Sequence, residues 1–489
     1  MAFRAYDQNQ TFLLPPCLDE WVEEDHPARI LSEIVDRLDL SCLRIAKETG
    51  RPPYHPKMLL KVLLWAYATG VRASRKIEEK LYSDIVFMWL AGMEKPNFRT
   101  ICLFRHSNLA SINNLFTEVL MLTKGLGLLR LGLVTLDGTK MQANAGIDSF
   151  KRIKEWRKEF NEVKKEVRQI LEEVEAVDSA DDRRYGSKNR GDELPKELEK
   201  SKERMKKIEK LLSEIEEGED EDIRVSMTDP EARLMHRKSS YLPAYNAQAA
   251  VTEDQIIVYA DITVEPVDVN QLLPALDGIK ELCGDMPEKV AADSGYGGGK
   301  NLKGLEERRV DGYIPETDER NIGKMKRRNP ELYGKEDFKY DEKKDHYVCP
   351  AGKVLSPQVK SRIKTKYSER EVTIYRTEHG VCSSCEQKPR CTTTRNKVGR
   401  AVSRDRYEKV RARMREKLKT EVGKEIYGKR KCLVEPVFGQ IRVIEKFIQF
   451  LLRGLERVKI EWKWAAIVHN LLKIIRKVKA GEVRLAKVE

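Results

Sequence analysis

Two short apolar stretches, far apart in the chain, each run into an aspartate that glycine soon follows. The first covers residues 133–137 before Gly138, and the second covers residues 289–293 before Gly295. Apolar runs of this length, bounded by turn residues, are typical of buried strands. The first pattern therefore predicts a strand that presents Asp137 at its end, a glycine turn, and a second strand that returns alongside.

A carboxylate at the end of a buried strand has two interpretations. An aspartate before glycine is most often a turn residue that hydrogen-bonds its own backbone. It is also costly to bury unless a positive charge meets it, as happens at a binding site. Further strand and helix signals lie at residues 245–251, 255–264, 270–283, 302–305 and 312–315. They indicate a mixed sheet with helices, in which Asp137 and Asp293 can converge on the edge where open α/β sheets keep their sites.

The length and charge of the chain limit its class. With 489 residues it is too long for a single core, and two to four domains are expected. The 92 Lys and Arg outnumber the 79 Asp and Glu, for a net charge of +13. That excess favours a polyanionic partner, although many basic enzymes and ribosomal proteins share it. No apolar run reaches the length of a membrane span and residues 1–16 lack a signal-peptide layout, so we expect a cytoplasmic protein with no membrane segment.

Residues 25–128 have helical periodicity throughout. Pro56 predicts the first residue of a buried helix that Gly70 closes. Further helices are expected at residues 74–81, 84–90 and 99–123. Short helices with interspersed arginines fit a helix-turn-helix unit that binds DNA, and they fit equally well a small bundle that only packs.

Beyond residue 150, apolar residues recur at spacings of three and four. The first such seam runs from Ile153 to Val177, a polar stretch over residues 178–191 breaks it, and the second runs from Leu198 to Ile215. The pattern predicts an antiparallel helical hairpin, with helices of about 25 and 20 residues, inserted into the sheet domain. A structural arm is the first interpretation, and an element that covers DNA or contacts a second copy is the alternative.

Four of the nine cysteines cluster in the sequence. They are Cys349, Cys382, Cys385 and Cys391. A Cys-x-x-Cys pair with two more thiols fits the tetrahedral ligand set of a structural zinc ion, in a basic ribbon too small to fold unaided. His346 and His379 are near enough in sequence to replace one thiol. Four reduced cysteines that cluster by chance, or a redox pair, are the alternatives.

A glutamate precedes the last helices. Pro436 predicts a helix that begins there and ends near residue 452, with Glu435 just before it. A basic helix over residues 403–422 is expected upstream, and a packing helix over residues 456–479 downstream. The expected buried stripe is Val437, Ile441, Ile444, Ile448 and Leu451. A glutamate at a helix start is usually only a dipole partner, but flanking arginines suit an anionic substrate beside a metal-binding carboxylate.

Taken together, these motifs are similar to those of insertion-sequence transposases of the DDE class, whose catalytic core has the ribonuclease H fold. The resemblance rests on residues 3–16, 54–57, 137–140, 229–232 and 293–296, the four cysteines, and residues 435–439. It implies that Asp137, Asp293 and Glu435 bind two Mg²⁺ ions, with Mn²⁺ as a substitute, and that Asp137 bridges both.

The same resemblance suggests the residues that contact DNA. Lys140, Arg430 and Arg442 are the expected phosphate contacts, and Tyr427 with Arg430 matches part of the family's tyrosine-arginine-glutamate-lysine signature. The signature is only approximate here. Arg430 and Glu435 are one residue too far apart, and Arg442 stands where lysine is usual.

The resemblance also implies a domain plan. We expect an all-α DNA-binding domain at residues 1–128, a mixed α/β ribonuclease H-like core at 129–146 and 225–335, the helical hairpin at 147–224, a zinc-ribbon-like insertion at 336–400, and C-terminal helices of the core, carrying the catalytic glutamate, at 401–480.

The implied function is a transposase that binds the terminal inverted repeats of its element, cleaves DNA and joins the 3′-hydroxyl to target DNA, as a homodimer in the DNA complex. Two alternatives stay open. One is an inactive or repurposed DNA-binding derivative, and the other is a ribonuclease H-like nuclease without strand transfer. A purely structural coiled-coil protein would explain residues 150–216 alone.

Overall fold

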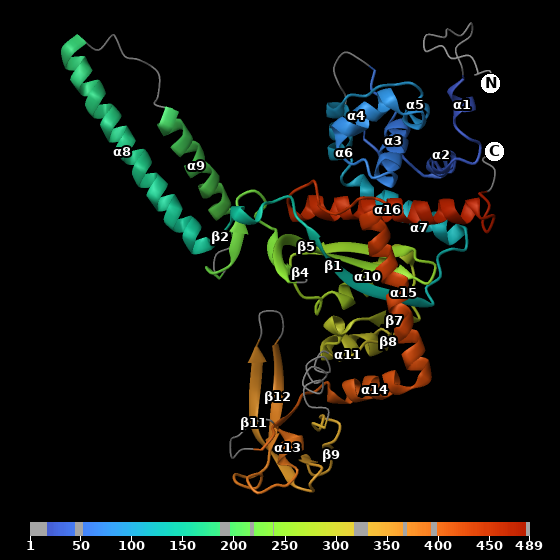
Figure 1. Cartoon of the computed structure of the whole chain (residues 1–489), viewed down its shortest axis with the longest axis vertical. Helices are drawn as coiled ribbons and strands as arrows, with labels where there is room; N and C mark the ends of the chain where they lie inside the picture. Colours follow the sequence, from blue (N-terminus) through green and yellow to red (C-terminus); the bar gives the residue numbers. More distant parts are fainter. Residues whose placement is uncertain are drawn as a thin grey trace, which may run out of the picture.

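The computed structural model describes residues 17–44, 52–185, 196–215, 220–237, 239–316, 331–364, 369–392 and 399–485, with the backbone alone at 173–185 and 196–197. The motif at residues 3–16 lies outside them. Figure 1 shows a central sheet with helices on both sides, a long helical arm that projects from it, and a separate small sheet beneath it.

The central sheet is mixed, as the sequence predicts. Its strands in the described residues are β1 (Leu133–Gln142), β4 (Arg233–Arg237), β5 (Ser240–Thr252), β6 (Ile257–Thr263), β7 (Lys289–Ala292) and β8 (Asp311–Tyr313). They follow the order β4-β5-β1-β7-β8, and β6 pairs with β5. β1 is antiparallel to β5 and parallel to β7, which makes β1 the centre of the sheet.

The predicted turn at Gly138 is wrong, because β1 continues as one strand through Asp137 and Gly138. Gly138 instead allows neighbouring side chains to pack closely against the backbone of β1. A Cβ atom there would lie 2.3 Å from Nε2 of Gln248 and 2.7 Å from Oδ1 of Asp268. Glycine is therefore required because neighbouring side chains fill the space above it, and not because the chain reverses.

The N-terminal helices and the sheet share one hydrophobic core. The helices are α1 (Leu18–Trp21), α2 (Pro27–Arg37), α3 (Pro56–Ala68), α4 (Ser74–Ser83), α5 (Ile85–Leu90), α6 (Phe98–Ser107) and α7 (Ser111–Gly125). One continuous cluster of buried residues joins them to the sheet and to α16 (Leu455–Lys479). Trp462 of α16 is fully buried, and its indole nitrogen donates to the carbonyl of Gln248 at 2.9 Å.

The helix predicted over residues 99–123 is two helices. The chain breaks between α6 and α7 at Asn108, whose buried side chain accepts from the amide of Arg44 at 2.6 Å and donates to its carbonyl at 2.9 Å. These hydrogen bonds to a segment far away in the sequence hold the chain at the break between the two helices. Local periodicity does not predict such a contact. Pro56 does begin α3, and Gly70 follows α3 with a positive φ of 74°, as the sequence predicts.

The helical hairpin is present. Helices α8 (Ile153–Tyr185) and α9 (Lys196–Ser213) pack on each other and rise from a two-stranded base made by β2 (Phe150–Arg152) and β3 (Arg224–Ser226) (Figure 1). The first helix passes the break expected at residue 178. The hairpin is fixed at its root, where the indole nitrogen of Trp156 donates to the carbonyl of Val225 at 3.0 Å.

The cysteine-containing insertion forms its own small sheet. Its strands are β9 (Lys339–Asp341), β10 (His346–Val348), β11 (Val354–Lys364), β12 (Glu369–Arg376) and β13 (Val402–Arg404), and the short helix α13 (Lys388–Cys391) lies beside them. The core is small, and it is built from Phe338, Tyr347, Leu355, Tyr375 and Val402. The insertion is therefore a separate body with little apolar support of its own.

Two predicted helices near the C-terminus differ in the structure. The helix expected over residues 403–422 is strand β13 followed by α14 (Glu408–Lys419). The helix expected to begin at Pro436 is α15 (Glu421–Val443), which runs continuously through that proline. Proline has no N–H for the carbonyl of Cys432, and the side-chain amide of Gln255 donates to that carbonyl at 3.2 Å instead.

The end of α15 also differs from the prediction. Val437 and Ile441 are buried as expected, but the helix ends at Val443, and Ile444, Ile448 and Leu451 are exposed. The packing helix expected over residues 456–479 is α16. None of the described helices is both long enough and apolar enough to cross a bilayer.

Candidate active site

The central sheet brings Asp137 and Asp293 together. β1 and β7 are parallel neighbours, and Leu136 lies opposite Ala292, so the next residue on each strand is the aspartate. Each carboxylate accepts a hydrogen bond from a nearby backbone amide. Asp137 Oδ1 accepts from Gly138 at 2.9 Å, and Asp293 Oδ1 accepts from Gly295 at 2.7 Å.

The surroundings of Asp137 disfavour its charged form. Burial raises the pKa of its carboxyl to about 6, the positive charge of Arg430 acts in the opposite sense, and the negative charges of Asp293 and Asp268 raise the pKa further. The guanidinium of Arg430 lies 3.4 Å from Asp137 Oδ2, and both side chains are largely buried. One arginine therefore offsets only part of the negative charge gathered at this edge.

Asp268, on the loop between β6 and α10 (Leu272–Cys283), is a third carboxylate at the site that sequence reasoning missed. Its Oδ1 accepts from Asn246 at 2.7 Å and from Gln248 at 2.8 Å, and it lies 3.7 Å from the ammonium of Lys140. One signal was available in the sequence. Asn246 and Gln248 alternate with alanines in residues 246–250 of β5, and buried amides require polar partners.

A buried polar layer continues from Gln248 to the loop after β7. The hydroxyl of Tyr296 donates to Gln248 Oε1 at 2.5 Å, and burial raises the pKa of that hydroxyl well above its usual range. Asn301, in α11 (Gly299–Glu307), donates to the carbonyls of Tyr296 and Val269. The loops that follow β6 and β7 are thus tied to each other and to β5.

Two buried polar atoms at the site lack a hydrogen-bond partner among the described residues. They are Oδ1 of Asn246 and Nε of Arg430, and both side chains are more than nine-tenths buried. Buried polar atoms are rarely left unpaired. An acceptor beside the carboxylates suits a cation or a water bound to one, and a spare guanidinium N–H suits an anion.

Helix α15 carries the remaining predicted residues. Tyr427 and Arg430 face Asp137 and Asp293, whose charges act on the pKa of the Tyr427 hydroxyl; burial raises that pKa most. Arg442 contacts the other half of β1, where its guanidinium donates to Thr139 Oγ1 and to the carbonyl of Lys140. The predicted phosphate contacts are therefore engaged with the protein's own acceptors.

Glu435 lies between Arg430 and Arg442 along α15, and its side chain is exposed. It precedes Arg442 by seven residues, about two turns, so the two share one side of the helix beside β1. The charges that perturb the pKa of Asp137 come from Arg430, Asp293 and Asp268. The two aspartates are thus gathered at the sheet edge, whereas Glu435 stands apart from them on the flank of the helix.

The motif at residues 229–232 has a structural role. Asp229 is buried and accepts from the hydroxyl of Tyr245 at 2.7 Å and from the amide of Gly454 at 3.1 Å. Glu231 accepts from the amide of Leu455 at 2.7 Å, which satisfies a donor at the start of α16. The motif fixes the loop before α16 and is separate from the aspartate pair.

The four cysteines converge. Cys349, Cys382, Cys385 and Cys391 all line one small cavity of about 30 Å³ in the insertion. All are free thiols, and burial raises the pKa of Cys391. His346 lies on β10 and His379 follows β12, and neither is among the lining residues of this cavity.

Comparison with known protein families decides the class. The family model described as Transposase DDE domain matches residues 348–475, and the model described as Transposase domain (DUF772) matches residues 16–107. Both matches support an insertion-sequence transposase of the DDE class. No curated protein matches it. The first match contains the four cysteines and Glu435, the second covers the described helices α1 to α6, and Asp137 and Asp293 of the transposase lie outside both.

A DDE domain implies the use of divalent metal ions, and the site of the transposase fits a cation in part. Within the described residues, no three His, Cys, Asp or Glu side chains are arranged to hold a metal ion together. Asp137 and Asp293 nevertheless follow paired residues of β1 and β7, and the unpaired Oδ1 of Asn246 lies over Gly138, the residue next to Asp137. Carboxylate and amide oxygens are ligands that Mg²⁺ prefers.

The raised pKa of Asp137 predicts how pH affects the stability of the metal-free transposase. An unfolded aspartate has a pKa of about 3.9. Folding therefore carries a free-energy cost for the charged carboxylate of Asp137. This cost is absent below the unfolded pKa and grows as the pH rises to about 6, the pKa in the folded chain. We therefore expect Asp137→Asn to increase the free energy of unfolding by about 1–3 kcal/mol at pH 7.5 and by much less near pH 4.

Denaturant unfolding in EDTA at several pH values measures this effect. Asp148→Asn is the matched control, because it removes the same charge from an exposed side chain. A stabilisation by Asp137→Asn that is equal at both pH values, or a loss of stability at pH 7.5, would contradict the electrostatic account.

Proposed function

We propose that this transposase binds the ends of its element, cleaves a phosphodiester bond at the edge of the central sheet, and joins the 3′-hydroxyl to target DNA. The observation that carries the proposal is the pair Asp137 and Asp293 on adjacent parallel strands, with Arg430 held against Asp137. Paired carboxylates with a buried arginine fit chemistry on a phosphate anion.

In this proposal Asp137, Asp293 and Glu435 would hold two Mg²⁺ ions, which would supply activation of the attacking oxygen and stabilisation of the leaving oxygen. Glu435 completes the set when DNA is bound, because its exposed position beside β1 leaves it free to turn toward the aspartates.

The basic residues position the substrate in this scheme. The guanidinium of Arg430, which has an unpaired Nε, binds a phosphate next to the site, since its fork of donors matches phosphate oxygens. Tyr427 lies with Arg430 on α15, and their ring and guanidinium are 5.9 Å apart. Lys140 and Arg442 contact phosphates farther along β1. Such contacts fix the register of the duplex without reading its sequence.

Asp268 acts in this scheme as a positioning residue. It holds Lys140 at one side of the site, and through Asn246 and Gln248 it holds the strand that faces Gly138. Its Oδ1 accepts from both amides and lies 3.7 Å from the ammonium of Lys140.

The remaining assignments follow the same resemblance. We propose that the core is ribonuclease H-like, supported by the central β1 with its antiparallel and parallel neighbours, that the N-terminal helices bind the terminal repeats, and that the transposase works as a homodimer. We propose domain limits at 1–128, 129–146 with 225–335, 147–224, 336–400 and 401–480.

The first test is a cleavage and joining assay on DNA that flanks the gene, with Mg²⁺, Mn²⁺ or EDTA. Asp137→Ala and Asp293→Ala should each lower cleavage by at least about 1,000-fold while DNA binding persists, because the lost interactions act on the reaction and not on docking. Asp148→Ala is the matched control and should cut normally.

The products of this assay separate the alternatives. A cut product without a joined product would indicate a nuclease, and binding of end DNA without cutting would indicate a repurposed derivative. Metal-dependent cutting by Asp137→Ala at the wild-type rate would remove Asp137 from the site.

A structural zinc ion is proposed for the insertion. Four cysteines are a ligand set of structural zinc, and all four line one cavity beside a small core around Tyr347 that needs added stabilisation. The described side chains are not arranged to hold a metal ion as they stand, so zinc binding would draw the thiols together. Purified protein should carry about one zinc ion per chain by elemental analysis, and Cys382→Ser with Cys385→Ser should lose it. The matched control replaces the exposed Cys17 and Cys432 by serine and should keep the zinc. Wild-type protein without zinc, after growth with zinc, would refute this assignment.

A further inference from the structure

The insertion carries a two-stranded ribbon with little packing of its own. Strands β11 and β12 pair from Ser356 with Arg376 to Lys364 with Glu369, and in this part of β11 the side chains are exposed or half-buried. Figure 1 shows this ribbon standing out from the rest of the small sheet. A ribbon that buries so little apolar area is not explained by folding alone.

One face of the ribbon is basic. Lys360, Arg362 and Lys364 occupy alternate positions of β11, so their side chains point to the same face. The acidic residues opposite them, Glu369 and Glu371, each lie 3.2 Å from the guanidinium of Arg362. One arginine therefore engages both acids, and the two lysines add positive charge beside it.

This basic face opens into a groove, which we call the ribbon groove. It has a volume of about 780 Å³ and is lined by Lys360, Ser361, Arg362, residues 369–373 and residues 404–407. Five of its lining side chains are basic and three are acidic. One of those acids, Asp405, is buried and its charge is neutralised by Arg411, which lies 2.5 Å away.

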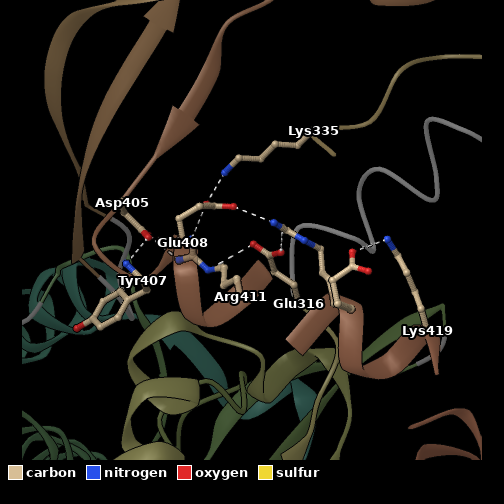
Figure 2. A network of polar contacts seen from close by, with 9 residues as sticks. Glu316, Lys335, Asp405, Tyr407, Glu408, Arg411 and Lys419 are labelled. Carbon is tan, nitrogen blue, oxygen red and sulfur yellow. Dashed lines mark hydrogen bonds and ion pairs between the residues drawn. The ribbon is translucent and has the colours of Figure 1, made fainter. Parts of the chain in front are cut away.

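A buried network of charges fixes the ribbon groove relative to the core. Figure 2 shows Asp405, which follows β13 of the insertion's sheet, Glu408 and Arg411 from α14, and Glu316, which follows β8 of the core sheet. Arg411 contacts Glu316 at 3.3 Å and Asp405, while Lys335 contacts Glu408 at 2.5 Å.

A second arginine strengthens this connection. Arg415 lies 2.6 Å from Glu316 and 2.9 Å from Glu408. Buried ion pairs contribute little net stability compared with apolar packing, but they specify one geometry. The network therefore links Asp405, at one side of the ribbon groove, through Arg411 to Glu316 of the core.

We propose that the ribbon groove binds the sugar-phosphate backbone of duplex DNA. The partner fits on two grounds. Lys360, with Arg404 and Arg406 across the groove, supplies positive charge that phosphates attract, and Lys364 extends this charge along the same face of β11 just beyond the groove. A two-stranded ribbon also has the width that the major groove of B-DNA admits. The inference rests on the proposed function, because it adds a second DNA contact distant in sequence from the cleavage site.

The experiment measures binding of a fluorescent 40-base-pair duplex to the full-length chain over a series of salt concentrations. Lys360→Glu with Lys364→Glu should weaken binding by about tenfold at low salt and reduce the slope of log K against log salt by about two, one for each lost phosphate contact. Lys343→Glu with Lys344→Glu is the matched control, since it makes the same charge change at exposed residues of the same insertion, outside the groove.

The outcomes separate this inference from the proposed function. Wild-type-like binding by the groove variant, or equal weakening by the groove and control variants, would overturn the ribbon groove as a DNA site. If the wild-type chain itself fails to bind duplex DNA, the proposed function fails with it. Circular dichroism and melting temperature, unchanged in both variants, exclude misfolding as the cause.

Discussion

The structure depends on the repulsion among carboxylates at one edge of a sheet. Asp137 and Asp293 follow paired residues of adjacent parallel strands, and Asp268 adds a third negative charge. Such crowding in a buried place is unfavourable. The surrounding residues serve to make it tolerable. Gly138 gives the side chains room, the amides of β5 hold Asp268, and the guanidinium of Arg430 partly neutralises Asp137.

The rest of the chain positions groups around this edge. Helix α15 presents Arg430, Glu435 and Arg442 along β1, and its unusual internal proline is accommodated because Gln255 satisfies the carbonyl that Pro436 leaves free. Buried ion pairs hold α14, which follows the last strand of the insertion's sheet, against Glu316 of the core. The same network reaches the side of the proposed ribbon groove through Asp405, which pairs with Arg411.

The sequence predicted those parts of the fold that depend on local pattern. The strands that carry Asp137 and Asp293, the helical hairpin and α16 follow from periodicity. The wrong predictions at Gly138 and Pro436 share one cause. At both positions, residues far away in the chain change what the local pattern would otherwise specify. A glycine that permits close packing resembles a turn glycine, so Gly138 was misread. A proline whose lost hydrogen bond is replaced by a distant side chain resembles a helix start, so Pro436 was misread. Asp268 lies on a loop with no periodicity and becomes recognisable only through its partners.

The most direct measurement for the central claim is metal-directed cleavage of the polypeptide itself. Fe²⁺ bound in place of Mg²⁺ generates radicals that cut the backbone near its ligands when ascorbate and peroxide are added. The account predicts cuts near residues 137 and 293 in the free transposase, a further cut near residue 435 when end DNA is bound, and competition by Mg²⁺. Cuts confined to residues 349–391, or no cut near either aspartate, would contradict a metal site at the edge of the central sheet.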